Sequence, residues 1–227
     1  ANVANPTLEQ EPFWDPLIDV VGWAQENVLS ILCSCLSTHA LVKHLYRVDR
    51  RLMPQKLWGV YSHRVANSKQ KHPLLRDINT RFDAPHSRHN RISPEALEAA
   101  GVTVLIESET GEVHMAVSSD QFSIVYFQGH PEYDRNSLLK EYKREVNRYI
   151  SGDREDYPSH PENYFFDEVA TIVDAYEQVV YKAKDQGESV PPFPEEQIEP
   201  HVDNTWRDTG KALFNNWLGL VHQKADF

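Results

Sequence analysis

The spacing of apolar residues in the first part of the chain predicts a helix, a strand and a second helix. Apolar side chains recur at helical intervals between Phe13 and Asn27. The short, partly β-branched run from Val28 to Cys33 is typical of a strand buried inside a parallel sheet. Another helical pattern begins after Cys35. We therefore expect Cys35 to lie at a strand-to-helix junction.

The middle of the chain favours strands. Residues 109–112 are predicted to form a hairpin turn between two of them, because polar residues and a glycine separate two apolar runs. The last strand leads directly into Gly129-His130-Pro131-Glu132. The four expected strands are Lys56–Arg64, Val102–Ile106, Val113–Val117 and Phe122–Phe127.

The later part of the chain is predicted to be mainly helical. Apolar residues keep helical register across residues 138–150 and again across 169–180, where Asp167 is expected to cap the helix and Gly187 to end it. A proline-rich stretch at 191–200 predicts an extended connection, and a last helix is expected from Asn204 or Thr205. Because strands and helices alternate, we predict one α/β domain over residues 1–227 with some antiparallel strands.

Composition narrows the classes of function. The formal net charge of −11 disfavours non-specific binding to nucleic acid, which requires a basic surface. No stretch approaches the roughly 20 apolar residues that span a bilayer, and the first ten residues lack the layout of a signal peptide. Cys33 and Cys35 are too close together to staple the fold with a disulfide. We therefore expect a reduced, cytoplasmic protein with no membrane or nucleic-acid partner.

Cys35 is a candidate nucleophile. A residue at a sharp strand-to-helix turn projects above the sheet, and a thiolate there gains from the positive end of the following helix. Such a turn crowds the backbone, and the small residues Cys33 and Ser37 stand two positions before and after it. Glycines, which are commoner at those positions, are absent. The alternative is a buried cysteine that simply ends a core strand.

His130 and Glu132 are candidates for a base and its partner. A histidine just past an apolar strand stands where α/β proteins build their sites, at the carboxyl edge of the sheet. Its imidazole could take the proton of a cysteine, and Glu132 could accept the other ring N–H and fix the tautomer. The alternative is a turn histidine beside a solvated glutamate. The spacing of Cys35, His130 and Glu132 leaves a Cys-His-Glu enzyme and a purely structural role both open.

Two other polar groups allow competing interpretations. Cys33, Cys35 and His39, with His86 and His89 further along, resemble a set of metal ligands, but zinc clusters mostly pair cysteines as C-x-x-C rather than C-x-C. The polar segment 82–90 is expected to be a loop. It is either solvated or grips a carboxylate or phosphate through arginine.

Several distinctive runs are spread over nearly the whole chain. The most specific combination is APHSRH (84–89), GHPEYD (129–134) and NTWR (204–207), and further runs are PQKLWGVYSHRV (54–65), ESETGEVHMAVS (107–118) and EYKRE (141–145). Together these runs resemble those of homoserine O-succinyltransferases. The resemblance implies the fold of the class I glutamine amidotransferases: a flavodoxin-like parallel-sheet core with added antiparallel strands. It also implies a cytoplasmic homodimer without a bound metal or cofactor.

The resemblance implies a chemical role for specific residues. The family transfers an acyl group from a coenzyme A thioester to the γ-hydroxyl of homoserine, a step toward methionine. The nucleophile falls on Cys35, the base on His130 and its carboxylate partner on Glu132. The family's substrate-binding residues fall on Lys56, Ser87, Arg88 and Arg144. Succinyl-CoA is the first expectation for the donor, and acetyl-CoA the second.

Three departures from the family pattern keep alternatives open. The family usually has Trp-Gly-Ala-Gln after the nucleophile, where this chain has Leu36-Ser37-Thr38-His39. The family's N-terminal stretch, with early strands of the sheet, is expected to precede the first residue of this chain. The region that separates succinyl from acetyl donors falls near residues 5–9 and does not align cleanly. The alternatives are a serine O-acyltransferase, an amidotransferase-like cysteine hydrolase, and a regulatory or binding protein without turnover.

Overall fold

The computed structural model describes residues 7–225, and the chain divides into two compact units. The larger unit is Ala1–Glu132 with Thr205–Phe227, and the smaller unit is Tyr133–Asn204. We describe each unit by itself. That residues 1–227 act together as one catalytic domain stays a prediction. Within residues 7–225, no helix has both the length and the apolar character needed to cross a bilayer.

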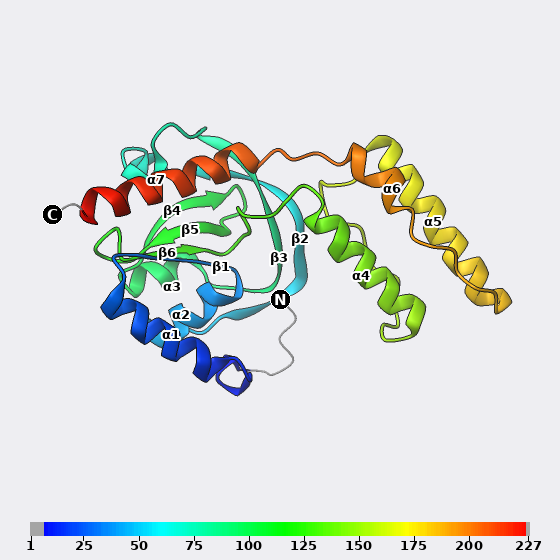
Figure 1. The fold of residues 1–227 in the computed structure, drawn as a ribbon, viewed down its shortest axis with the longest axis horizontal. Coiled ribbons are helices and arrows are strands. Elements are labelled where there is room, and N and C mark those ends of the chain that lie inside the picture. Colours follow the sequence, from blue (N-terminus) through cyan, green and yellow to red (C-terminus); the bar gives the residue numbers. More distant parts are fainter. Residues whose placement is uncertain (1–6, 226–227) are drawn as a thin grey trace. The chain divides into compact units, whose positions relative to one another are not determined.

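The larger unit is built on a mixed six-stranded sheet (Figure 1). The strands lie in the order β1-β6-β5-β4-β2-β3. Within the described residues, only the pairing of β1 with β6 is parallel, and the other pairings are antiparallel. The strands are β1 (Ile31–Ser34), β2 (Arg51–Val65), β3 (Arg81–Arg91), β4 (Thr103–Ser108), β5 (Val113–Val117) and β6 (Ile124–Phe127).

Helices cover both faces of this sheet (Figure 1). Along β6, Ile124 and Tyr126 belong to one apolar core and Val125 and Phe127 to another, because successive side chains of a strand point to opposite faces. The first core includes residues of α1, α2 and α3, and the second includes residues of α7 and η3. These elements and the remaining short ones are η1 (Leu8–Gln10), α1 (Trp14–Asn27), α2 (Leu36–Tyr46), η2 (Asn67–Lys69), η3 (Pro73–Leu75), α3 (Pro94–Ala99) and α7 (Arg207–Ala225).

The smaller unit is helical. It contains α4 (Ser137–Ser151), α5 (Asp167–Gln186), α6 (Glu195–Ile198) and η4 (Glu199–His201). Gly187 ends α5 in the left-handed conformation at φ 66°, as predicted. The prediction that Asp167 caps α5 is wrong: Phe166 is the cap residue and makes no side-chain cap bond, while Asp167 is already the first helical residue. The prediction of an extended segment at 191–200 is wrong for α6 and η4, where Ile198 is buried.

The sequence prediction fails most at β3. Residues 82–90 were expected to be a loop, but they pair with β2 in register, with Ser87 opposite Trp58. Polar residues can be buried there because they bind one another, as described below. Pro85, which lacks an N–H, is tolerated because β3 is an edge strand. The α/β class, the hairpin between β4 and β5 and the other predicted strands are confirmed, with shifted ends.

Candidate active site

Cys35 stands at the turn between β1 and α2, as predicted. Its backbone has φ 50° and ψ −112°, a conformation that non-glycine residues rarely adopt. Its N–H donates a 2.7 Å hydrogen bond to the carbonyl oxygen of Phe127 at the end of β6. Since β1 and β6 run parallel with Ser34 opposite Phe127, the residues that follow both strands emerge at one edge of the sheet. This pairing brings Cys35 and the 128–132 segment together.

His130 and Glu132 form a hydrogen-bonded pair at this edge. Nδ1 of His130 lies 2.8 Å from Oε1 of Glu132, and Ser34 donates to the same oxygen at 3.1 Å. The backbone N–H of His130 donates to the carbonyl of Pro85 in β3 at 2.8 Å. Burial opposes ionisation of Glu132, but the hydrogen bond and charge of His130, together with the hydrogen bond from Ser34, outweigh it and lower the pKa of the carboxyl. The ring is therefore fixed in place by backbone and carboxylate together.

His130 also hydrogen-bonds the thiol of Cys35. Burial alone would raise the pKa of Cys35, but the hydrogen bond and charge of His130, with the charge of Arg88, bring it below its ordinary value. Burial would lower the pKa of His130, whereas its bonds to Cys35 and Glu132 raise it. Both shifts favour a thiolate–imidazolium pair, the reactive form of a cysteine nucleophile.

The residues after Cys35 tie α2 to the two strands. The hydroxyl of Ser37 donates to the carbonyl of Ser34 at 2.7 Å, and that of Thr38 donates to the carbonyl of Phe127 at 2.7 Å. His39 lies 3.2 Å from Oε1 of Gln128 and is buried, which lowers its pKa to about 3. Leu36-Ser37-Thr38-His39 therefore supports the turn through polar contacts.

A narrow cavity adjoins the cysteine. Cys35 Sγ lies 4.0 Å from the carbonyl oxygen of Ser87, and the cavity has a strongly basic wall formed by Arg50 and Arg88. It is lined by Cys35, Leu36, His39, Arg50, Arg88, His89 and Asn90. Two guanidinium groups beside a buried thiol favour its anionic form, and they suit an anionic substrate.

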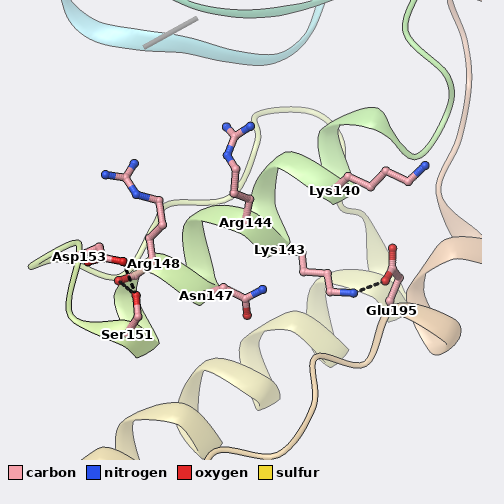
Figure 2. Close-up of a pocket in the computed structure, with 8 residues that line it drawn as sticks. All are labelled: Lys140, Lys143, Arg144, Asn147, Arg148, Ser151, Asp153 and Glu195. Atoms are coloured by element: carbon pink, nitrogen blue, oxygen red, sulfur yellow. Dashed lines mark hydrogen bonds and ion pairs between the residues drawn. The ribbon is translucent and has the colours of Figure 1, made fainter. Parts of the chain in front are cut away.

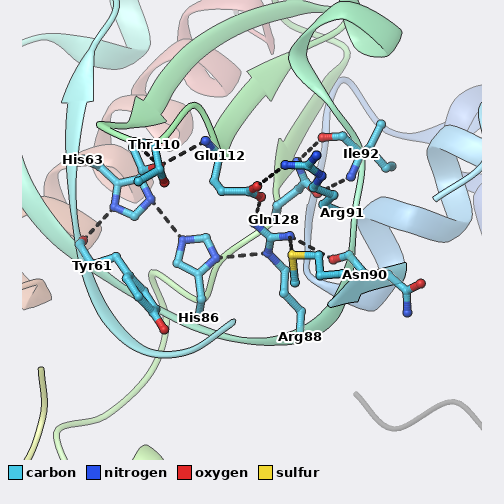
Figure 3. A network of polar contacts seen from close by, with 12 residues as sticks. Tyr61, His63, His86, Arg88, Asn90, Arg91, Ile92, Thr110, Glu112 and Gln128 are labelled. Atoms are coloured by element: carbon cyan, nitrogen blue, oxygen red, sulfur yellow. Dashed lines mark hydrogen bonds and ion pairs between the residues drawn. The ribbon is translucent and has the colours of Figure 1, made fainter. Parts of the chain in front are cut away.

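Arg88 is held by a buried polar network (Figure 3). Its side chain is 2% exposed and forms a 2.7 Å ion pair with Glu112. It also donates to Nδ1 of His86 at 3.2 Å and to the carbonyl of Asn90 at 2.9 Å. Burial lowers the pKa of Arg88, and the bond to Glu112 opposes that change. The other oxygen of Glu112 accepts from Arg91 at 2.7 Å.

Three buried histidines lie next to this network, and their nitrogens are close enough together to suggest a metal site. They are His63, His86 and His114. Arg88 donates to Nδ1 of His86, so a neutral His86 carries its proton on Nε2 and donates it to His63 across 3.1 Å. Burial holds His86 neutral by lowering its pKa. To bind a metal ion, Nε2 of His86 would have to lose this proton. A metal-bound histidine also normally donates its other ring N–H to a neighbouring acceptor, whereas Nδ1 of His86 accepts from Arg88. The pairing of His86 with His63 therefore fits a hydrogen bond rather than a metal site, and neither ring nitrogen of His114 has a hydrogen-bond partner.

Two glycines allow close packing around the His130 segment. A Cβ atom on Gly129 would lie 2.7 Å from Nδ1 of His114 and 2.8 Å from the ring of His86. A Cβ atom on Gly210, in α7, would lie 2.6 Å from the carbonyl oxygen of Pro131. Both distances are too short for any side chain, which explains the glycines in GHPEYD and in the run that follows NTWR.

The structure brings some of the predicted site residues together and separates others. Ser87 and Arg88 lie at the cysteine with His130 and Glu132. Lys56 lies on β2 with Nζ 3.9 Å from the centre of the Trp58 ring, and it does not line the cavity. Arg144 lies on α4 in the smaller unit. Residues 5 and 6 of the expected donor-selecting region lie outside the described residues.

Sequence reasoning missed several contributors to the site. Arg50 and Glu112 each occur in a stretch where polar residues are common, so no local pattern distinguishes them, and Ser34 is a single polar residue at the end of an apolar run. A weak signal existed for Ser34, because it directly precedes the expected nucleophile. The proposed ligand set of Cys33, Cys35 and His39 is not a cluster: Cys33 donates to the carbonyl of Val125, and burial raises its pKa to about 12. His39 instead contacts Gln128.

Comparison with known proteins agrees with this geometry. A solved glutamine amidotransferase from Thermotoga maritima has a similar fold, with a TM-score of 0.55 over 97% of this chain and 74% of that one, at 14% identity. Homoserine O-succinyltransferases from Methylococcus capsulatus and Nitrosococcus oceani are 58% and 55% identical over 226 and 223 residues. These matches cover 100% and 98% of this chain, which spans 63% and 62% of the length of those relatives. The model of the homoserine O-succinyltransferase family matches residues 1–227, and the chain belongs to that family.

Proposed function

We propose that this chain transfers a succinyl group from succinyl-CoA to the γ-hydroxyl of homoserine, a step of methionine biosynthesis. The observation that carries the proposal is the contact of Cys35 with His130 and of His130 with Glu132, found in a chain of this family. The named relatives are longer than this chain, so the activity in their names supports the proposal but does not by itself establish that activity for this chain.

In the first step, the thiolate of Cys35 attacks the thioester carbonyl carbon of the acyl donor. The tetrahedral intermediate carries its negative charge on oxygen, and the N–H of Leu36 at the start of α2 is the proposed donor to it. The carbon–sulfur bond to coenzyme A then breaks. His130, protonated by the thiol, gives its proton to the leaving thiolate, and an acyl-cysteine remains.

In the second step, neutral His130 takes the proton of the homoserine hydroxyl. The oxygen attacks the acyl-cysteine carbonyl, the bond to Sγ breaks, and the O-acyl product leaves Cys35 as a thiolate beside imidazolium. Glu132 keeps the imidazole in the tautomer that presents Nε2 to the reaction, since Nδ1 faces its carboxylate at 2.8 Å.

Homoserine is expected to be held by its carboxylate. Arg88 and Arg144 are the two candidates for this contact: Arg88 lines the cavity beside Cys35 and donates to Glu112, His86 and Asn90, and Arg144, on α4 (Figure 2), is 59% exposed and paired with Glu145. Arg88 also gives electrostatic support to the Cys35 thiolate. Lys56 and Ser87 remain proposed substrate-binding residues. The homodimer, the cytoplasmic location and the absence of a bound cofactor stay predictions.

Intact mass spectrometry tests the proposal. The protein is mixed with succinyl-CoA or acetyl-CoA, with and without homoserine. We expect one succinyl adduct that disappears when homoserine is added. Cys35→Ser should abolish the adduct, and Cys33→Ser is the matched control that should keep it, because Cys33 is buried and bound to Val125. No adduct on a folded protein would contradict the proposal and favour a non-catalytic homologue.

The same experiment separates the rival enzymes. Loss of the adduct on addition of serine, but not of homoserine, would indicate a serine O-acyltransferase. Steady release of free succinate that ignores both amino acids would indicate a cysteine hydrolase on the same scaffold.

A further inference from the structure

Arg50 lines the cavity beside Cys35 and takes no part in the steps described above. It lies in the connection 47–50, between the end of α2 and the start of β2. The first residues of β2 pair with the last residues of β3, the strand that carries Arg88. The fold therefore returns Arg50 to the thiol, although the whole of α2 separates the two residues in the sequence. Both residues belong to the larger unit.

The lining of this cavity has an excess of positive charge. Among the described residues that form it, none is an aspartate or a glutamate. His39 is uncharged at neutral pH, because burial lowers its pKa to about 3. Burial also lowers the pKa of Arg50, whereas the charges of Glu11 and Cys35 raise it. A cationic wall on an acidic protein attracts anions to one place.

Arg50 has more of its donors open to a ligand than Arg88 has. All three side-chain nitrogens of Arg88 donate within the protein, to His86, to the carbonyl of Asn90 and to Glu112 (Figure 3). Arg50 is half-buried, and within the part of the chain that the structure describes its side chain forms no ion pair and no hydrogen bond. Its planar fork of N–H groups matches the two oxygens of a carboxylate.

A succinyl group brings a second negative charge close to the thiol. Two methylene groups join its thioester carbonyl to its carboxylate, so the two carbons lie at most about 4 Å apart. The cavity measures about 10 Å³, which is room for about one water molecule and hence for one carboxylate oxygen. Moving a carboxylate out of water without a countercharge is costly, so the acyl group requires a cation here.

We propose that Arg50 binds the terminal carboxylate of the succinyl group and thereby selects succinyl-CoA over acetyl-CoA as the donor. This inference rests on the proposed function. The succinyl group gains charge-assisted hydrogen bonds from the guanidinium group, both in the bound donor and in the acyl-cysteine. The acetyl group carries no charge and gains nothing from this cation. Arg50 is thus a residue that determines specificity, and it leaves the chemistry to Cys35 and His130.

Competition between the two donors tests the selection directly. We expect Arg50→Gln to lower the ratio of kcat/KM for succinyl-CoA to kcat/KM for acetyl-CoA by about tenfold or more. The ratio cancels any effect of Arg50 on the thiol, because both donors meet the same thiol. Arg51→Gln removes the next cation along the chain, which is exposed, and is the matched control that should leave the ratio unchanged. An equal loss with both donors would overturn the inference and assign Arg50 to the reacting carbonyl.

Alkylation tests the same contact without any need for turnover. Iodoacetate and iodoacetamide are similar in size and both react with the Cys35 thiolate, but only iodoacetate carries a carboxylate. The ratio of their rates at pH 7, measured on the Cys35 peptide by mass spectrometry, should fall about fivefold in Arg50→Gln. It should stay unchanged in Arg51→Gln. The same ratio in Arg50→Gln and in the unaltered protein would overturn the inference.

A charge-conserving variant guards against a structural effect. Arg50→Lys should keep most of the preference for iodoacetate, and a loss as large as that in Arg50→Gln would show that the side chain does not act through its charge.

The two assays also separate this inference from the proposed function. A preference for iodoacetate that depends on Arg50, in a protein that transfers no acyl group, would refute the proposed function and leave the anion site supported. Transfer from succinyl-CoA with both ratios unchanged in Arg50→Gln would leave the function supported and refute the inference.

Discussion

Ser34 donates a 3.1 Å hydrogen bond to the carboxylate oxygen of Glu132 that also faces His130. Ser34 is the last residue of β1 and directly precedes Cys35, so the strand that carries the thiol also fixes the far end of the Cys35–His130–Glu132 chain. The thiol of Cys35 and the carboxylate of Glu132 are therefore linked through only two hydrogen bonds, that of Cys35 with His130 and that of His130 with Glu132.

Ser34→Ala should lower acyl transfer. The loss of one donor to a half-exposed carboxylate leaves Glu132 freer to turn away from His130, at a cost of about 1 kcal/mol. We expect kcat to fall about fivefold with KM unchanged. Ser34→Thr keeps the hydroxyl and should restore most of the rate. A loss of the same size in Ser34→Thr would contradict this role for the hydroxyl.

The reactivity of Cys35 should depend on His130. The pKa of Cys35 lies below its ordinary value, so iodoacetamide should alkylate it at a pH below the usual thiol range. Without the imidazole, burial, which raises the pKa of the thiol, is opposed by weaker charges such as that of Arg88. His130→Ala should therefore move the pH profile of alkylation upward and slow the reaction at pH 7 at least tenfold. A profile identical in the two proteins would show that His130 does not activate the thiol.

Gly129→Ala should destabilise the protein by about 2 kcal/mol, because the new methyl group overlaps the rings of His114 and His86. Gly219→Ala is the matched control, since Gly219 is exposed on α7 with no neighbour within 4 Å of the added atom. It should stabilise the helix by up to about 1 kcal/mol. Urea denaturation measures both, and equal effects would contradict the close approach.

Glu112→Gln should cost about 3 kcal/mol of folding free energy. The substitution leaves the buried guanidinium of Arg88 without its countercharge. Arg91 binds the same carboxylate but is half exposed, so Arg91→Gln should cost less than about 1 kcal/mol. Urea denaturation of the two variants gives the comparison. A loss of folding free energy in Arg91→Gln as large as that in Glu112→Gln would show that the exposed Arg91–Glu112 pair, and not the buried Arg88–Glu112 pair, stabilises the fold.

Stability should fall as the pH falls below about 6.5, the pKa of histidine in an unfolded chain. Burial lowers the pKa of His63 to about 4, and it also lowers the pKa of His86 and His114. Between pH 6.5 and 4 the unfolded chain binds protons that the folded chain does not, so the free energy of unfolding decreases as the pH drops.

His114→Leu provides the control for this pH dependence. Both ring nitrogens of His114 are buried without a hydrogen-bond partner, so an apolar side chain of similar size should be tolerated. The variant should lose less stability between pH 6.5 and 5 than the unaltered protein, by about 1 kcal/mol per pH unit. Thermal melts at the two pH values decide the matter, and an unchanged slope would show that His114 does not titrate in this way.

Periodicity predicted the elements in which it is strong. The helix Trp14–Asn27, the strand Val113–Val117 and the helix Ser137–Ser151 all follow clear patterns of apolar residues. It failed at β3, where buried positions are occupied by His86, Ser87 and Arg88. A pattern of apolar residues cannot identify a strand whose inward side chains are polar and are satisfied by partners far away in the sequence.

The site residues that could be predicted from the sequence are those that directly follow a strand. Cys35 and the GHPE segment each come directly after an apolar strand, which suffices to place them at the edge of a sheet. Nothing in the local sequence indicates that β1 and β6 are neighbours. That adjacency, and with it the contacts of Ser34 and Glu112, depends on the order of the strands.

The close approach of Gly210 to Pro131 has a consequence for synthesis on the ribosome. Leu213 belongs to the core on one face of the sheet, and α7 is separated from the last strand by the whole smaller unit of about seventy residues. At about 5–20 residues per second, several seconds pass between the emergence of His130 and that of α7. During that interval the apolar face that α7 will cover is packed only by η3 and the sheet itself, so this is the stage at which a chaperone would find exposed apolar surface.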